Sequence, residues 1–223
     1  TEANVVSLSG GGQLTASSID VPSDISSAAF FIVAACITPN SDITLQHVGI
    51  NPTRTGVIDI LLKMGANIRL FNEGLVGGEK VADIQVKTSQ LTGISIPENL
   101  VALAIDEFPV IFVAAAYAQG KTIVTGAEEL RVKESDRIQT MADGLQAIGV
   151  DALATTDGMI IQGGRVLGGT IESFDDHRIA MSFAVAGLQS AGVIQINNCK
   201  NVSTSFLNFV ELASSCGFNL QVQ

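Results

Sequence analysis

The sequence predicts an α/β (α+β) domain made of three similar units arranged around a pseudo-threefold axis. An Asp precedes an apolar, Ala-rich segment three times, and an Ala lies ten residues after each Asp. A glycine suited to the end of a helix follows 41, 43 and 41 residues after the same Asp residues. Such self-similarity indicates one repeated supersecondary unit. The pairs are Asp24 with Gly65, Asp106 with Gly149, and Asp176 with Gly217.

Each unit is expected to hold two helices with different surroundings. The Ala-rich segment after each Asp should be a buried helix with its Asp near the N-cap, where a carboxylate accepts hydrogen bonds from free N–H groups. The helix that ends at each glycine is amphipathic, so it should lie outside the first helix. Small Ala side chains let helices approach closely, which suits three central helices at a crowded axis.

Short β-rich runs flank these helices in every unit. We therefore expect one domain of three strand–helix–strand–helix–strand units, at about 1–80, 81–157 and 158–223, with the sheets on the outside. A solenoid is the rival architecture, although these units are longer than usual solenoid periods. The expected strands are 4–8, 82–86 and 159–162 ahead of each Asp, 43–45, 122–124 and 193–196 between the helices, and 67–70, 151–153 and 218–222 after the glycines.

Composition argues against several classes of function. With 22 acidic and 12 basic residues, the 223-residue chain has a formal charge of −10, which argues against general nucleic-acid or anionic-membrane binding. The three cysteines form no C-x-x-C pair, so we expect reduced, packed thiols and a cytoplasmic location. The longest apolar run, residues 28–37, is too short to span a bilayer. The first residue is Thr rather than Met, which suggests a piece of a longer protein.

A basic stretch, Arg131–Arg137, stands out because it holds three of the twelve basic residues of this acidic chain. It precedes a helical apolar pattern, so we expect it to open a helix. Lys133 and Arg137 are four residues apart, and one helical turn would place their side chains on neighbouring surface. The free N–H groups of a helix start add partial positive charge, so the stretch suits an anion. A self-paired, solvated helix start is the alternative.

Two further groups of ionisable residues lie at expected helix starts. Asp106 is followed by Glu107 between apolar segments, and desolvation there should raise proton affinity, which suits proton transfer. N-capping is the alternative role for Asp106. In the third unit, Arg178 ends an Asp-Asp-His-Arg sequence, so it either binds an anion or pairs with an adjacent carboxylate.

Other motifs carry less chemistry. His177 is expected to be a structural hydrogen-bonding residue, and with one other histidine in the chain we expect no histidine metal site. Thr53 should cap the second helix of the first unit, and Arg54 should be structural. Gly10–Gly12 and Gly163–Gly164 match neither phosphate-loop pattern, so we expect hairpin turns. The sequence contains no Gly-x-Ser-x-Gly and no His-Glu-x-x-His motif, so serine hydrolases and zinc proteases have no support.

Five stretches of the chain, taken together, point to one family. They are DISSAAFF at 24–31, NPTRTG at 51–56, DEFP at 106–109, RVKESDR at 131–137 and DHRIAM at 176–181. In this order, over essentially the whole chain, they resemble 5-enolpyruvylshikimate-3-phosphate synthase, and the last two are its most specific signatures. The resemblance implies an inverse β-prism domain, of which the family has two. Family members are about twice as long, so the chain resembles the C-terminal half, without the N-terminal domain.

The resemblance also implies a reaction and a division of roles. The family transfers the enolpyruvyl group of phosphoenolpyruvate to the 5-hydroxyl of shikimate 3-phosphate through a tetrahedral intermediate, releasing phosphate, with no metal or other cofactor. Asp106 matches the carboxylate that contacts this hydroxyl and transfers a proton. Glu134 matches the acid that exchanges a proton with the methylene carbon, and Lys133 matches the lysine that polarises the reacting oxygen. Arg137 and Arg178 match arginines that hold the carboxylate and phosphate of phosphoenolpyruvate.

These five residues are expected to open onto one concave surface, because they start different helices at equivalent ends of the domain. The family site lies between two domains and closes on binding. The partners implied are therefore the two small-molecule substrates and the N-terminal domain of the same protein. Because that domain supplies much of the substrate binding, the isolated chain should fold without turning over substrate.

Two positions depart from some family members. Some carry Lys just before the Phe of the last helix, where this chain has Ser205, and some carry Asn in place of Glu129. The remaining anion ligands around residues 203–205 are therefore unassigned. Two other functions stay open. One is the related enolpyruvyl transfer to UDP-N-acetylglucosamine, against which the KESDR stretch argues. The other is a noncatalytic threefold scaffold, in which the ionisable residues would be structural pairs.

Overall fold

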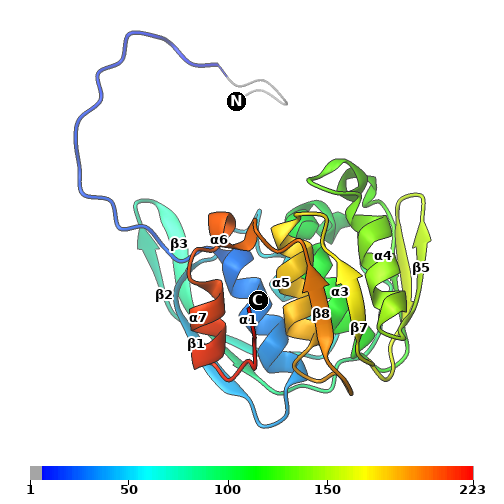
Figure 1. Cartoon of the computed structure of the whole chain (residues 1–223). Coiled ribbons are helices and arrows are strands. Elements are labelled where there is room, and N and C mark those ends of the chain that lie inside the picture. Colours follow the sequence, from blue (N-terminus) through cyan, green and yellow to red (C-terminus); the bar gives the residue numbers. More distant parts are fainter. Residues whose placement is uncertain (1–6, 223) are drawn as a thin grey trace.

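The structure is a computed structural model that describes residues 7–222. Residues 7–22 form an extended segment that runs away from the body of the molecule (Figure 1). The elements, with η for a 3-10 helix, are α1 (Ile25–Ile37), β1 (Asp42–Gly49), α2 (Gly56–Lys63), β2 (Asn67–Val76), β3 (Glu79–Lys87), η1 (Glu98–Leu100), η2 (Ala102–Glu107), α3 (Phe108–Ala116), β4 (Lys121–Val124), η3 (Glu128–Val132), α4 (Arg137–Ala147), β5 (Asp151–Thr155), β6 (Gly158–Gln162), β7 (Gly169–Glu172), α5 (His177–Ala186), β8 (Ile194–Asn197), α6 (Val202–Ser205) and α7 (Phe209–Ser215).

Three apolar helices, α1, α3 and α5, form the centre of the core and pack against one another. Every residue of α3 is buried, and α1 buries all of its residues except Ser27 and Ile37. Figure 1 shows these helices in the middle of the body, with the strands around them. The predicted central position of the Ala-rich helices is confirmed, and their small side chains account for the close packing.

Two of the three predicted Asp caps are confirmed. Asp24 accepts hydrogen bonds from the backbone N–H groups of Ser26 and Ser27 at the start of α1. Asp176 accepts one from the N–H group of Arg178 at the start of α5. Both carboxylates therefore satisfy N–H groups that an α-helix leaves without an internal partner.

The cap prediction is wrong for Asp106, which lies inside η2 and caps no helix. Helix α3 begins at Phe108, and Pro109 occupies its first turn. Because a helical turn leads directly into α3, and because proline has no N–H group, this helix start needs no carboxylate cap. The carboxylate of Asp106 is thus free to contact other segments.

Two antiparallel sheets and one parallel pair of strands surround the central helices. The strand order is β1-β3-β2 in the first sheet and β4-β6-β5 in the second, so the last strand in sequence lies in the middle of each. Strands β7 and β8 pair in parallel. All six strands predicted for these two antiparallel sheets lie within the observed elements, at 43–45, 67–70, 82–86, 122–124, 151–153 and 159–162.

The third sheet is smaller than predicted. The strand expected at 193–196 is present one residue later as β8, but residues 218–222 form no strand. In the other two sheets the closing strand pairs with a middle strand, β3 or β6. The part of the chain described here places no such strand beside β8, so residues 218–222 have no neighbour to pair with. The strand expected at 4–8 lies mostly outside the described residues, and Ser7 and Leu8 are not in a strand.

The amphipathic helices α2, α4 and α7 end near the predicted glycines. The backbone angle φ is 93° at Gly65, 84° at Gly149 and 94° at Gly217. This left-handed conformation costs glycine little and is disfavoured for residues with a Cβ atom. The three predicted helix ends are therefore confirmed.

The start of α2 differs from the prediction that Thr53 caps it. The helix begins at Gly56 without a side-chain cap, and Asn51 Oδ1 instead accepts hydrogen bonds from the N–H and hydroxyl groups of Thr53. Gly56 packs closely against η2, because an added Cβ would lie 2.7 Å from the carbonyl carbon of Leu103. This close approach ties α2 to the 3-10 helix that carries Asp106.

The two glycine-rich stretches are not hairpin turns, contrary to the prediction. Gly10–Gly12 lie in the extended segment, and Gly163–Gly164 lead from β6 toward β7 without joining paired strands. The backbone carbonyl of Ala118 approaches Gly163 so closely that a side chain there would collide with it. The hairpin between β2 and β3 turns instead at Gly77–Gly78.

The cysteines are only partly packed. Cys36 is buried, whereas Cys199 and Cys216 are exposed, so the expectation of packed thiols is wrong for two of the three, and all three thiols are free. Within residues 7–222, no helix is both long and apolar enough to cross a membrane. The described residues also contain no group of three His, Cys, Asp or Glu side chains arranged to hold a metal ion.

Candidate active site

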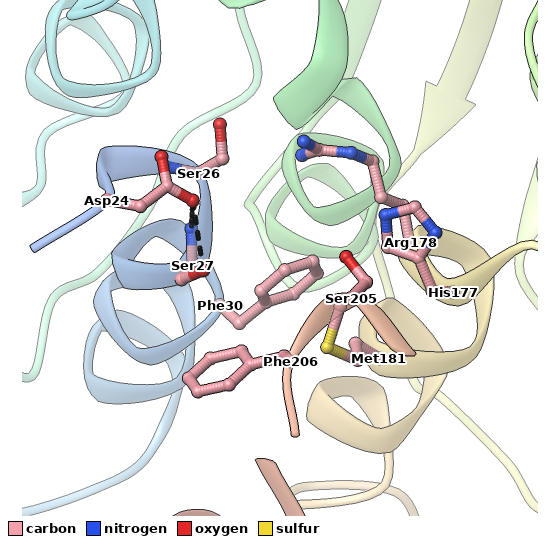
Figure 2. Close-up of a pocket in the computed structure, with 9 residues that line it drawn as sticks. All are labelled: Asp24, Ser26, Ser27, Phe30, His177, Arg178, Met181, Ser205 and Phe206. Atoms are coloured by element: carbon pink, nitrogen blue, oxygen red, sulfur yellow. Dashed lines mark hydrogen bonds between the residues drawn. The ribbon is translucent and has the colours of Figure 1, made fainter. Parts of the chain in front are cut away.

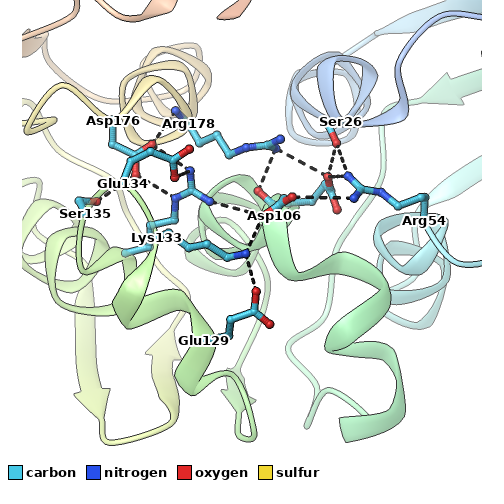
Figure 3. Close-up of polar contacts among 11 residues, drawn as sticks. Ser26, Arg54, Asp106, Glu129, Lys133, Glu134, Ser135, Asp176 and Arg178 are labelled. Carbon is cyan, nitrogen blue, oxygen red and sulfur yellow. Dashed lines mark hydrogen bonds and ion pairs between the residues drawn. The ribbon is translucent and has the colours of Figure 1, made fainter. Parts of the chain in front are cut away.

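Charged side chains gather where four segments meet: η2, the loop ahead of α2, the turn between η3 and α4, and the start of α5 (Figure 3). All five residues selected in the sequence analysis belong to this group, although 72 positions separate Asp106 from Arg178. We call this group the charged cluster. It consists of Arg54, Asp106, Glu107, Lys133, Glu134, Arg137, Asp176 and Arg178.

Asp106 lies at the centre of the charged cluster. Its Oδ1 lies 3.4 Å from Lys133 Nζ and 3.6 Å from Arg137 Nη1, and its Oδ2 lies 3.8 Å from Arg54 Nη1. Burial raises the pKa of Asp106, but the charges of three cations, Arg178 first, lower it by more, so this pKa lies below its usual range. The predicted rise in proton affinity is wrong here, because nearby cations outweigh desolvation.

Glu107 is enclosed by protein and is only 2% exposed. Ser26 Oγ donates a hydrogen bond of 2.5 Å to its Oε1. Burial raises the pKa of Glu107 by more than Ser26 and the neighbouring arginines lower it. The predicted rise in proton affinity therefore holds for Glu107, where desolvation is the larger effect.

Arg137 is held by a buried ion pair with Asp176, whose side chains are 1% and 0% exposed. Arg137 Nε lies 2.8 Å from Asp176 Oδ2, and Ser135 Oγ donates a further hydrogen bond of 3.0 Å to that oxygen. Burial raises the pKa of Asp176, but the hydrogen bond and charge of Arg137 contribute to a larger lowering. The pair fixes the guanidinium of Arg137, whose Nη2 lies 2.6 Å from Glu134 Oε2.

The predicted helix does begin at the end of the basic stretch, but residues 133–136 do not form the helical turn that was expected there. Helix α4 begins only at Arg137, and Asp136 is its N-cap. Asp136 Oδ1 accepts a hydrogen bond from the N–H group of Gln139, so this carboxylate serves the helix start that the sequence analysis assigned to an external anion. Arg131 also turns away from the site, because its Nη1 lies 2.6 Å from Asp136 Oδ2.

Lys133 reaches the charged cluster from extended backbone that follows η3. Its Nζ lies 2.6 Å from Glu129 Oε1 and 3.4 Å from Asp106 Oδ1. The hydrogen bond to Glu129, followed by the charge of Asp106, raises the pKa of Lys133, so the amine stays protonated at neutral pH. Glu129 therefore anchors this lysine. Glu134 stands nearby with a side chain that is 54% exposed.

Arg178 and Arg54 approach Asp106 from two sides (Figure 3), and both also lie near Glu107. Arg178 Nη1 donates a hydrogen bond of 3.0 Å to the backbone carbonyl of Asp106. Arg54 Nη2 donates one of 2.9 Å to Ser26 Oγ and lies 3.5 Å from Glu107 Oε1. Arg54 was predicted to be structural and was not among the predicted site residues. The available signal was its place within the NPTRTG stretch at 51–56.

A small pocket adjoins the charged cluster and is lined by Arg178, a member of the cluster, and by Ser26, which contacts Arg54 and Glu107 (Figure 2). In Figure 2 the guanidinium of Arg178 extends from α5 toward the start of α1. His177 also lines the pocket, and burial followed by the charge of Arg178 lowers its pKa, which favours the neutral ring. Of the five predicted residues, Arg178 is the one that lines this pocket. Ser205, from the stretch left unassigned, lines it too.

These groups suit an anionic substrate that takes part in proton transfer. Cationic groups converge from the loop ahead of α2, the turn before α4 and the start of α5, which would offset negative charge on a bound molecule. Asp106 is a carboxylate at neutral pH and can therefore accept a proton from a neighbouring hydroxyl. The exposed carboxyl of Glu134 provides a second acid–base group beside Arg137.

The fold is that of the enolpyruvyl transferases. The solved structure of the enolpyruvyl transferase NikO from Streptomyces tendae matches with a TM-score of 0.64 at 17% identity, over 88% of this chain and 43% of that one. At this identity the match shows the fold alone.

Closer relatives identify the family. The family described as EPSP synthase (3-phosphoshikimate 1-carboxyvinyltransferase) matches residues 1–212, and the chain belongs to it. A solved EPSP synthase from Acinetobacter baumannii matches with a TM-score of 0.96 and 56% identity, over 100% of this chain and 52% of that chain. The 3-phosphoshikimate 1-carboxyvinyltransferase of Hydrogenovibrio crunogenus is 62% identical over 96% of this chain, and that of Methylococcus capsulatus is 58% identical over 99%. The chain spans 49% and 51% of these two relatives, or about half their length.

Proposed function

We propose that the whole protein containing this chain transfers the enolpyruvyl group of phosphoenolpyruvate to the 5-hydroxyl of shikimate 3-phosphate and releases phosphate. The observation that carries the proposal is the contact of Asp106 with Lys133 and Arg137, in a chain that belongs to the EPSP synthase family. This chain would supply one side of the active site. A further domain of the same protein would supply the other side, since the chain spans about half the length of its relatives.

The chemistry requires two proton transfers, and the charged cluster has groups for both. In the addition step the 5-hydroxyl oxygen bonds to C2 of phosphoenolpyruvate, the hydroxyl loses its proton, and the methylene carbon gains one. Asp106 is the proposed acceptor of the hydroxyl proton, since its lowered pKa keeps it ionised. Glu134 is the proposed acid for the methylene carbon, since its side chain is half exposed and its Oε2 lies 2.6 Å from Arg137 Nη2. Elimination then expels phosphate while the methyl carbon returns a proton.

Fixed cations have the remaining roles. Lys133 would polarise the reacting oxygen, and its contacts with Asp106 and Glu129 support a stable ammonium group there. Arg137 and Arg178 would hold the carboxylate and phosphate of phosphoenolpyruvate. The buried pairing of Arg137 with Asp176 supports this role, because a guanidinium already fixed loses little freedom when an anion binds.

We also propose the finer architecture and setting that the family resemblance implies. The fold would be an inverse β-prism of three units, at about 1–80, 81–157 and 158–223. The protein would act in the cytoplasm on its two small substrates and would use no cofactor. It would need neither nucleic acid nor a membrane.

The test is steady-state phosphate release by the whole protein from phosphoenolpyruvate and shikimate 3-phosphate. Turnover with shikimate 3-phosphate, and none with UDP-N-acetylglucosamine, is the expected result. Replacing Asp106 by Asn keeps the size of the side chain and removes the base, so kcat should fall by about 10²-fold or more. Turnover of the UDP-sugar alone, or no enolpyruvyl transfer at all, would reject the proposal.

A further inference from the structure

Glu107 joins three segments that are distant in sequence. Its Oε1 accepts a hydrogen bond of 2.5 Å from Ser26 Oγ at the start of α1. The same oxygen lies 3.5 Å from Arg54 Nη2, ahead of α2, and 3.6 Å from Arg178 Nη1, in the first turn of α5. One buried carboxylate oxygen therefore contacts a hydroxyl and two guanidinium groups from three different parts of the chain.

The fold does not by itself account for this buried carboxyl group. Glu107 occupies the N-cap position of α3, but its side chain caps no N–H group. Burying a carboxyl group is costly unless its partners compensate, and here the compensating partners are Ser26, Arg54 and Arg178 rather than groups of α3. The polar contacts of Glu107 therefore call for a role other than the stability of α3.

Glu107 itself does not line the adjoining pocket. Two of its three partners, Ser26 and Arg178, do line that pocket, and Figure 2 shows both side chains there. Among the described residues, Arg178 Nε and Nη2 have no hydrogen-bond partner, and neither atom is among the buried unsatisfied groups. Arg178 therefore keeps accessible donors for a ligand while its Nη1 is held by Asp106 and Glu107.

We propose that Glu107 is a positioning residue that holds Arg54 and Arg178 in place for an anionic substrate. Two guanidinium groups near one anion repel each other, and a carboxylate between them offsets that repulsion before the substrate arrives. The carboxylate also restricts both arginine side chains before the substrate binds, so less conformational entropy is lost on binding. The identity of the anion, phosphoenolpyruvate or shikimate 3-phosphate, rests on the proposed function, but the positioning role does not.

The variant Glu107→Gln in the whole protein distinguishes positioning from charge alone. Removing a negative charge near two arginines should tighten anion binding if only net charge matters. If positioning matters, the KM for at least one of the two substrates should rise by about tenfold, while kcat changes by less than about threefold. The control is Glu73→Gln, which removes the same charge from an exposed position on β2. A KM for both substrates that falls or stays at the wild-type value would overturn the proposal.

The variant Glu107→Asp distinguishes the effect of side-chain length from the effect of the negative charge. It keeps the carboxylate but shortens the side chain by one methylene group, so its oxygen should no longer reach Ser26, Arg54 and Arg178 together. The KM affected in Glu107→Gln should therefore stay raised by several-fold. A wild-type KM in this variant would assign the effect to charge and contradict the positioning role.

Crystal structures test the proposal independently of enzymatic activity. With wild type and Glu107→Gln in the same crystal form, we expect the guanidinium groups of Arg54 and Arg178 to move by about 1 Å or more, or to lose order. If Glu107→Gln does not fold, Glu107→Asp takes its place in both measurements. Guanidinium groups that stay in their wild-type positions would overturn the proposal. If the wild-type protein shows no enolpyruvyl transfer, the proposed function is rejected. The comparison of the two crystal structures then still tests the positioning role of Glu107.

Discussion

Asp106 and Glu107 are neighbours in the sequence, yet their surroundings shift their pKa values in opposite directions. The carboxylate of Asp106 lies within 4 Å of an ammonium and two guanidinium groups, whereas Glu107 is enclosed and desolvated. At the scale of single residues, one side chain is therefore an ionised base and the other a buried anchor. Substitutions of Asp106 should therefore affect kcat, whereas substitutions of Glu107 should affect substrate binding.

Replacing Glu134 by Gln removes an acid–base group while keeping its size and hydrogen-bonding ability. In the whole protein, kcat should fall by about 10²-fold or more, because the methylene carbon would lose its proton donor. Steady-state kinetics at saturating shikimate 3-phosphate measures this change. The matched control is Glu128→Gln, an exposed substitution in η3. A Glu134→Gln enzyme with unchanged kcat would remove Glu134 from the chemistry.

Replacing Arg178 by Ala removes a fixed cation beside the pocket. The KM for phosphoenolpyruvate should rise by about tenfold or more, with a smaller loss in kcat, because the ground-state contact with the anion is lost. Varying phosphoenolpyruvate at saturating shikimate 3-phosphate gives both constants. Arg165→Ala, at an exposed position between β6 and β7, is the control for lost positive charge. An unchanged KM would show that Arg178 does not bind phosphoenolpyruvate.

The main residues of the charged cluster could be predicted from the sequence, because short, specific motifs contain them. Arg54 was not among them, because the contacts of this side chain with Ser26 and Glu107 depend on how distant segments pack. The pKa direction predicted for Asp106 was also wrong, since its apolar neighbours in sequence say nothing about cations from other segments. Local context predicted desolvation correctly and could not predict the charges that outweigh it.

At the scale of elements, the buried pair of Arg137 and Asp176 fastens the start of α4 to the start of α5. Asp176 also caps α5, so one carboxylate serves both a helix start and a guanidinium. The repeated helices and their final glycines follow local periodicity and could be predicted. The non-helical turn before Arg137 could not, because contacts with other segments fix its conformation.

Asp176→Asn should destabilise the chain by about 3–5 kcal/mol, because it leaves the buried charge of Arg137 without its partner. Urea unfolding monitored by circular dichroism measures the free energy of unfolding. Asp24→Asn is the matched control, since Asp24 caps α1 without a salt bridge to a buried arginine and Asn is an equally good cap. The control should change stability by less than about 0.5 kcal/mol. Equal losses in the two variants would contradict the special role of the pair.

The same carboxylate should contribute to the pH dependence of stability. The pKa of Asp176 is lower in the folded than in the unfolded chain, so deprotonation favours folding. Its contribution is fully present well above the unfolded value of about 3.9 and is lost as the pH falls through the lower folded value. The free energy of unfolding should therefore fall less steeply below about pH 5 in Asp176→Asn than in the wild type. Identical slopes in urea titrations at several pH values would exclude this contribution.

At the scale of the whole molecule, the core is extensive but the third sheet has only two strands among the described residues. The sequence repeat predicted the six strands of the first two sheets. It did not predict that the third sheet lacks a closing strand, because a strand forms only where a neighbour offers its backbone groups, and the described residues place none beside the segment at 218–222.

The isolated 223-residue chain is expected to unfold cooperatively but to release no phosphate from the two substrates. Its apolar core should support folding, whereas the proposed active site would lack the groups of the proposed further domain, because the chain spans 49% of the length of a relative. Urea unfolding and the phosphate-release assay test the two parts separately, and the whole protein serves as the positive control for turnover. Normal turnover by this chain alone would mean that it holds a complete active site.

The middle strands β3 and β6 have a consequence for how such a repeat can be rearranged. Each follows its hairpin turn and inserts between two strands that precede it, so β1 and β2 are joined only through β3. The first strand of the second unit, β3, therefore completes the sheet of the first unit. Cutting the gene at the repeat boundary near residue 80 would leave an open gap in the first sheet. A working excision or circular permutation would have to keep β3 attached to the strands before it.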